Sequence, residues 1–132
     1  MMVLPNLTSG QSSKKIVARY GALFYNHEMG GNGLWWDEED ATHIRTRSVR
    51  YPGALDIEPE WTAEAAADPH RVIREPDPKS RVGYTRIIGY SSSAGFVLTV
   101  IVDPEDDSGV TAWKTRGTDL YEYLERQSRR SS

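Results

Sequence analysis

Cysteine is absent from this chain of 132 residues. Its absence excludes a disulfide scaffold, a thiol nucleophile and a zinc site with cysteine ligands. The chain also has no uninterrupted run of ~18 apolar residues, which is the length that a membrane-spanning helix needs. Its first residues lack the apolar segment of a secretory signal. We therefore expect a cytoplasmic protein that has no membrane partner.

The motifs of several enzyme classes are missing as well. No G-x-S-x-G, P-loop or G-x-G-x-x-G sequence is present, so nothing indicates a hydrolase of that type, a kinase or a dinucleotide-binding enzyme. H-E-x-x-H is also absent, and Glu39 with His43 alone is a weak signal for a metal. The sequence therefore predicts neither a metal nor another cofactor.

The residues that are present suffice for one domain. Apolar residues make up 38% and charged residues 27%, which allows a core under a well-solvated surface. We expect a disordered tail over 1–13, an N-terminal extension of unassigned role over 14–33, the domain over 34–126 and a polar tail over 127–132. Residues 14–20 fit a strand or, with the apolar residues that follow, a helix.

Two helices are expected early in the domain, after a short strand over 34–36. Asp37 is a good N-cap, and the acidic residues that follow it suit the positive end of a helix that runs to about Arg47. Pro59 then precedes an alanine-rich helix over 60–67.

From residue 70 the apolar residues alternate with polar ones, which is typical of strands. Four strands are expected, over 71–74, 82–90, 96–102 and 110–115. Short loops join the last three into an antiparallel meander. Thr118 caps a final helix over 119–126. The sequence thus predicts an α+β fold, in which two N-terminal helices and one C-terminal helix pack on one face of a small antiparallel sheet.

The first candidate site residues are His43 and Arg47, four residues apart on the expected first helix. Histidine titrates near neutrality, and arginine holds a phosphate through two parallel hydrogen bonds. The pair therefore suits proton transfer and phosphate binding. With Glu39 one turn earlier, the same spacing also fits an exposed charge ladder, and spacing alone favours the ladder.

Further candidates lie on the expected strands. Arg86 shares a strand face with Tyr84 and Tyr90, and it points either to solvent or into a site where tyrosines stack on bases. Lys114 and Arg116 stand just before a helix N-terminus, which attracts phosphate. Asp119 and Glu122 can also satisfy this helix end from within, which argues against a phosphate site there. If these cations are exposed, alanine at residue 86 or 114 changes stability by about 0.5 kcal/mol or less. The net charge of −3 argues mildly against general nucleic-acid binding and leaves room for a local basic face.

Three sequence features occur in a characteristic order. Trp36 and Asp37 open a helix that ends in HIRTRSV. The sequence RIIGYS is followed by an apolar strand. A last strand runs into Lys114 and Arg116 and is followed by a helix that carries Tyr121.

In this combination the segment from about 35 to 125 resembles the BrnT-like toxins of bacterial type II toxin–antitoxin systems. These are small ribonucleases with a fold like that of the RelE toxins. Their first helix has a basic-His-Gly-Val ending, and their strand reads R-Y-x-I-G-x-S. This chain departs from the family pattern in having Arg47 in place of the histidine, Ser48 in place of the glycine and Trp113 in place of an arginine.

The resemblance implies a toxin that halts translation by cleaving RNA without a metal and that a cognate antitoxin protein holds inactive. RNA and the antitoxin are then the partners. The catalytic residues that it implies are His43, Arg47, Arg86 and Lys114. The substrate-binding residues are Tyr84, Tyr90 and Arg116. If His43 points away, Tyr84, Tyr90 or a perturbed lysine would have to transfer the proton.

The departures from the family pattern motivate two other hypotheses. One is a non-catalytic module that binds protein or RNA and retains the fold. The other is a structural domain whose N-terminal extension mediates assembly. The ribonuclease toxin and the non-catalytic module differ in whether the four catalytic candidates converge on one concave surface.

Overall fold

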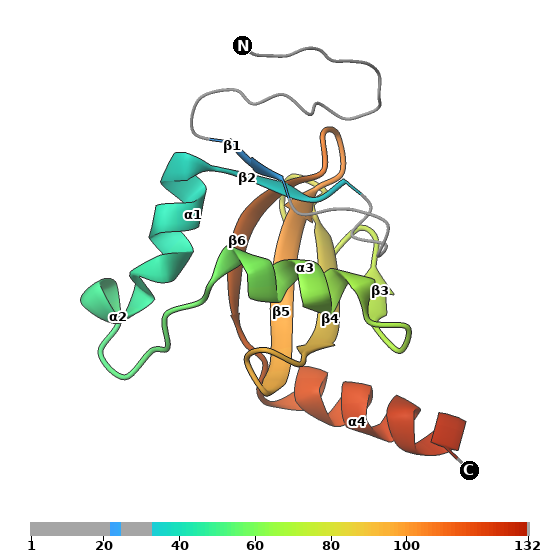
Figure 1. The fold of residues 1–132 in the computed structure, drawn as a ribbon. Helices are drawn as coiled ribbons and strands as arrows, with labels where there is room; N and C mark the ends of the chain where they lie inside the picture. Colours follow the sequence, from blue (N-terminus) through green and yellow to red (C-terminus); the bar gives the residue numbers. More distant parts are fainter. Residues whose placement is uncertain (1–21, 25–32, 132) are drawn as a thin grey trace.

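The structure, a computed structural model, describes residues 22–24 and 33–131. The tail predicted over 1–13 and the strand or helix considered over 14–20 lie outside these residues. The described part has an α+β fold, as predicted, with one sheet and helices packed on it (Figure 1). Of the predicted extension, Ala22–Phe24 forms a strand that pairs with the start of the domain.

The strands are β1 (Ala22–Phe24), β2 (Trp35–Asp37), β3 (Val72–Arg74), β4 (Thr85–Ser91), β5 (Phe96–Asp103) and β6 (Ser108–Lys114). The helices are α1 (Glu38–Arg45), α2 (Arg47–Arg50), α3 (Pro59–Ala67) and α4 (Thr118–Ser131). Asp37 caps α1 as predicted, because its carboxylate accepts a hydrogen bond from the backbone N–H of Asp40 (3.1 Å).

The sheet is mixed, in the order β1-β2-β6-β5-β4-β3. Strands β3 to β6 are antiparallel neighbours and form the predicted meander. The prediction of a purely antiparallel sheet was wrong, because β2 runs parallel to β6, with Trp35 opposite Ser108. Parallel strands need a long connection between them, and here the rest of the domain provides it.

The helices lie on both faces of the sheet, which corrects the prediction that all pack on one face. The core under α1 and α3 includes Trp36, whose indole N–H donates to Thr62 Oγ1 of α3 (2.9 Å). A second cluster, under α4, includes Ile88 and Tyr123. In β4 the neighbouring residues Ile87 and Ile88 belong to opposite faces. Helix α4 lies at the end of the sheet where β4 turns into β5 (Figure 1).

Several element boundaries differ from the prediction. The first helix ends at Arg45 instead of Arg47, and β4 begins at Thr85, after Gly83 has turned the chain at φ +82°. Helix α4 continues to Ser131, supported by ion pairs between residues four apart on its exposed surface, such as Glu122 with Arg126. Among the described residues, no helix is both long and apolar enough to cross a membrane.

Candidate functional site

Three cationic residues predicted for the site line one open cavity of about 440 Å³: Arg47, Lys114 and Arg116. The rest of the lining is small, apolar or hydroxyl-bearing: Gly53, Ala54, Leu55, Trp113 and Thr115. We call this cavity the cationic cleft. No carboxylate and no imidazole stands among its lining residues, so its charge is positive although the chain has a net charge of −3.

The end of β6 places Lys114 and Arg116 in the cleft. Thr115 is buried between them: its N–H donates to the Val97 carbonyl (2.9 Å), and its hydroxyl shares a hydrogen bond with the Thr99 hydroxyl (2.7 Å). Because side chains alternate along an extended chain, the inward Thr115 turns both of its neighbours outward. Both cations are exposed.

A break between α1 and α2 places Arg47 opposite them. Thr46 leaves the helical conformation (φ −126°, ψ 31°), and its hydroxyl donates to the Thr42 carbonyl (2.8 Å). The Asp56 carboxylate accepts from the N–H (2.8 Å) and the hydroxyl (3.1 Å) of Ser48. These contacts tie the short α2 to the following loop, which contributes the other wall of the cleft.

Aromatic rings stand among the cations of the cleft. The Tyr51 ring has the Arg47 guanidinium carbon 5.2 Å and the Arg50 guanidinium carbon 5.6 Å from its centroid, and the residue is 52% exposed. Trp113 lines the cleft itself. Proteins that bind single-stranded nucleic acids often combine aromatic rings, on which bases stack, with cations that bind the phosphates. Tyr51 was not predicted; the cation-rich run RTRSVRY was the signal in the sequence.

Arg86 does not face the cleft. It is 7% exposed, and its guanidinium nitrogens lie 3.0 Å from carboxylate oxygens of Asp77 and Asp119. Its guanidinium carbon is 5.4 Å from the Trp113 ring centroid. The sequence left open whether Arg86 points to solvent or into a site. The structure shows that it is buried and ties β4 to the first turn of α4.

This ion-pair cluster extends to Arg74, which pairs with Asp119 (2.8 Å) and with Glu122. Burial raises the pKa of Asp77, but hydrogen bonds from the Arg86 guanidinium and the Lys79 N–H outweigh it, and the pKa lies below the ordinary value. The expectation of a small effect for alanine at residue 86 is therefore wrong, because its premise of exposure fails.

His43 lies away from the cleft. It is exposed and lines a separate shallow pocket together with Glu38, Glu39 and Arg50. The helix break at Thr46 removes the regular four-residue spacing that would have put His43 and Arg47 on one face. The structure thus brings Arg47 and Lys114 together and leaves His43 and Arg86 outside the same cavity.

The two predicted tyrosines occupy different places. Tyr84 precedes β4, and its carbonyl accepts a hydrogen bond from the Asp77 N–H (2.8 Å). Tyr90 lies in β4, is partly exposed and lines a cavity of about 350 Å³ between the sheet and α4. Lys114 lines that cavity as well as the cleft. Neither tyrosine lines the cleft.

Asp68, which follows α3, links α4 to β4. Its carboxylate accepts hydrogen bonds from the Tyr123 hydroxyl (2.5 Å), the Tyr90 N–H (2.8 Å) and the His70 N–H (2.8 Å). Burial opposes ionisation, but these hydrogen bonds outweigh it and lower the pKa of Asp68. Burial and the bond to Asp68 also raise the pKa of Tyr123.

We expect the protein to lose stability in acid because of Asp68 and Asp77. Both pKa values are lower in the folded state than the ordinary 3.8, so the unfolded chain binds protons first. The stabilisation is present above pH 3.8 and is lost as pH falls through the folded-state values. Urea unfolding across this range should show it, with a weaker pH dependence in Asp68→Asn. An equal pH dependence in the two proteins would contradict the assignment to Asp68.

The described side chains contain no group of three histidine or acidic residues arranged to hold a metal ion. The cationic cleft is a candidate anion site, because three cations and no carboxylate of the described part of the chain line it. Comparisons of the chain with protein-family models, with curated proteins and with solved structures found no match.

Proposed function

We propose that this chain binds single-stranded RNA in the cationic cleft and cleaves it there, as a ribonuclease toxin that a cognate antitoxin protein restrains. The observation that carries the proposal is the convergence of Arg47 from one segment and of Lys114 and Arg116 from another on one cavity without a carboxylate. A phosphodiester is the anion that such a cleft suits, because arginine and lysine bind phosphate oxygens through charge-assisted hydrogen bonds.

The aromatic residues favour a single strand over a duplex. The Tyr51 ring lies near the guanidinium groups of Arg47 and Arg50 beside the cleft, and Trp113 is in the wall of the cleft. Bases can stack on such rings only when they are not paired within a helix. The net negative charge of the chain does not oppose this function, since a local positive concavity is enough to attract the backbone.

The chemistry that we propose is transfer within the RNA backbone. The 2′-hydroxyl loses its proton to solvent water as its oxygen attacks the adjacent phosphorus. The bond from phosphorus to the 5′-oxygen breaks, and the 5′-oxygen takes up a proton. Arg47 and Arg116 remain charged and stabilise the extra negative charge of the transition state. Lys114 is the lining cation able to donate a proton, and it takes the role of general acid to the leaving oxygen.

A second candidate function is RNA binding without cleavage. His43, the residue that the sequence predicted for proton transfer, lines a separate pocket, and no imidazole or carboxylate of the described residues lines the cleft. The cleft therefore contains side chains that can bind a phosphate, but its described lining includes no carboxylate or imidazole that could act as a general base. Assays of binding and of cleavage on the same samples distinguish the two functions.

Charge removal in the cleft should weaken RNA binding in a salt-dependent way. We expect Lys114→Gln and Arg116→Gln each to reduce the slope of log affinity against log salt by about 0.7, because each removes one phosphate contact to a single strand. Fluorescence anisotropy of a labelled single-stranded RNA measures this slope. Lys79→Gln is the matched control, since Lys79 is an exposed cation that does not line the cleft. A loss as large in the control would place the binding elsewhere.

The same RNA, analysed on a gel, tests catalysis. Products with 2′,3′-cyclic phosphate ends that disappear in Lys114→Gln would support the ribonuclease. Binding that depends on Arg47 and Lys114 without any product would support the binding module. A chain that is folded but neither binds nor cleaves single-stranded RNA would overturn both.

A further inference from the structure

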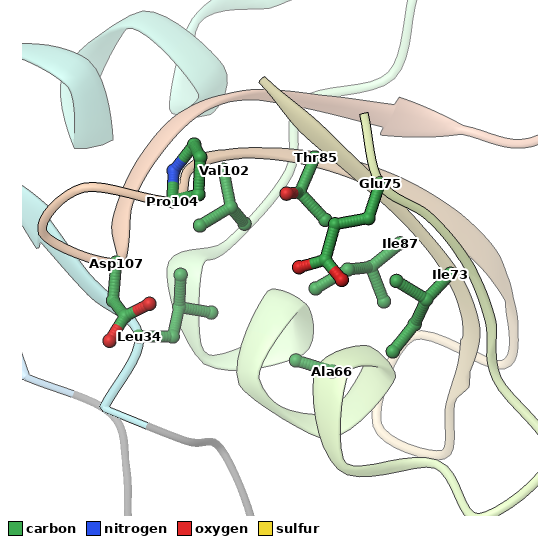
Figure 2. A pocket seen from close by; sticks show the side chains of 9 residues that line it. All are labelled: Leu34, Ala66, Ile73, Glu75, Thr85, Ile87, Val102, Pro104 and Asp107. Atoms are coloured by element: carbon green, nitrogen blue, oxygen red, sulfur yellow. The ribbon is translucent and has the colours of Figure 1, made fainter. Parts of the chain in front are cut away.

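Another cavity lies on the α3 side of the sheet, apart from the cationic cleft. Its volume is about 170 Å³, and most of its lining is apolar: Leu34, Ala66, Ile73, Ile87, Val102 and Pro104. Three residues with side-chain oxygens complete it, namely Glu75, Thr85 and Asp107 (Figure 2). Apolar walls with a few polar groups are typical of small-molecule sites.

The hydroxyl of Thr85 is the feature that points to a ligand. Thr85 is 6% exposed, and its Oγ1 is buried without a hydrogen-bond partner in the described part of the chain. Nearly all buried polar side-chain atoms in proteins have a partner, because an unpaired one costs stability. In Figure 2 this hydroxyl points into the cavity that Thr85 lines.

The carboxylate of Glu75 lies next to this hydroxyl. Arg74 of β3 is paired with Arg86 of β4, so the next residues of the two antiparallel chains, Glu75 and Thr85, stand opposite each other. Figure 2 shows both side chains at the same wall of the cavity. The structure has no hydrogen bond between them, and a donor placed between the two can serve both oxygens.

We propose that this cavity binds a small organic ammonium ion with an apolar body. The nitrogen donates hydrogen bonds to the Glu75 carboxylate and to Thr85 Oγ1, and the body packs against Ala66 and Ile87. A cavity of roughly 150 Å³ accepts benzene, so the body is about the size of one six-membered ring. Carboxylic acids of the same size are excluded, because Glu75 and Asp107 line the cavity with negative charge.

Three probes of equal size but different charge test the proposal: benzylammonium, benzyl alcohol and benzoate. Each is titrated into the full chain labelled with nitrogen-15, and the amide shifts around Ile87 and Val102 are followed. We expect saturable binding of benzylammonium, binding of benzyl alcohol weaker by about tenfold, since it lacks the charge-assisted hydrogen bond, and no binding of benzoate. Equal binding of all three, or no saturable shift with benzylammonium, would overturn the proposal.

Two variants locate the nitrogen. Glu75→Gln should remove most of the preference for benzylammonium over benzyl alcohol, and Thr85→Val should weaken benzylammonium several-fold. Thr85→Val keeps the shape of the side chain and removes an unpaired hydroxyl, so we expect its melting temperature not to fall. Glu60→Gln removes an exposed carboxylate of α3 that does not line the cavity and should leave binding unchanged. An unchanged preference in Glu75→Gln refutes the ammonium site.

Discussion

Arg86→Ala is expected to lower the free energy of unfolding by about 3–5 kcal/mol, the cost of breaking a buried ion pair from one side. The substitution leaves Asp77, which is 4% exposed, without its guanidinium partner. It also removes the Arg86 contact to Asp119 at the start of α4 and the cation above the Trp113 ring. Urea unfolding of the variant and of the parent protein measures the difference.

Two further variants separate the ion pair from simple loss of packing. Arg116→Ala removes an exposed arginine at the cleft and should change stability by no more than about 0.5 kcal/mol. Asp77→Asn combined with Arg86→Met leaves no unpaired charge at this pair, so it should recover part of the stability lost in Arg86→Ala. A loss below about 1 kcal/mol in Arg86→Ala would contradict the structural role assigned here.

The sequence alone predicted the elements that depend on local signals. The N-cap Asp37, the proline that opens α3, the alternation of residues in β4 and the apolar run of β5 each mark an element by short-range chemistry. These signals depend on neighbours a few residues away and are visible in a single chain. The number and order of the meander strands followed from them.

Which face of the sheet each helix covers could not be predicted in the same way. The apolar stripe of α4 shows that one side of the helix is buried, but both sheet faces present apolar residues, such as Ile87 and Ile88. The choice depends on contacts between distant residues, including the bond from the Tyr123 hydroxyl to Asp68 and the pairing of Asp119 with Arg86. No local pattern contains them.

In the candidate site, too, the features that depend on local signals were predicted and those that depend on distant contacts were not. Arg47, Lys114 and Arg116 were recognised singly as phosphate ligands, and the structure places them in one cleft. His43 was grouped with Arg47 on the assumption of one continuous helix. The break at Thr46 is held by contacts that include the distant Asp56 carboxylate, so the spacing did not reveal it.

The family resemblance put Arg86 among the catalytic residues, and the sequence alone could not decide, because an arginine within a strand looks the same whether it meets a ligand or a carboxylate. Its partners Asp77 and Asp119 lie on a turn and on another helix. A buried arginine needs such partners, since an unpaired charge in the interior is very costly. The proposed catalytic set therefore contains the cations that line the cleft and leaves out Arg86.

Gly89→Ala is expected to cost about 3 kcal/mol or more, because there is no room for a methyl group between β4 and α3. A Cβ at this position would lie 2.1 Å from the Ala65 carbonyl oxygen and 2.9 Å from its carbon. Both atoms belong to the helix backbone, so no change of rotamer relieves the overlap, and either α3 or β4 has to move. Overpacking of this kind typically costs 1–3 kcal/mol, and backbone contacts put it at the upper end. Gly89 is the glycine of RIIGYS, so close helix–sheet packing explains that part of the motif.

Gly95→Ala is the matched control for this effect. Gly95 has φ +82°, and a Cβ there meets nothing within 4 Å, so the only cost is the left-handed backbone, about 1–2 kcal/mol. Ala65→Gly gives a sharper test, because it removes the Ala65 side chain but leaves the carbonyl group that the new methyl meets. Combined with Gly89→Ala it should not restore stability. Recovery in that double variant would mean that side-chain crowding, and not the approach of two backbones, requires glycine at this position.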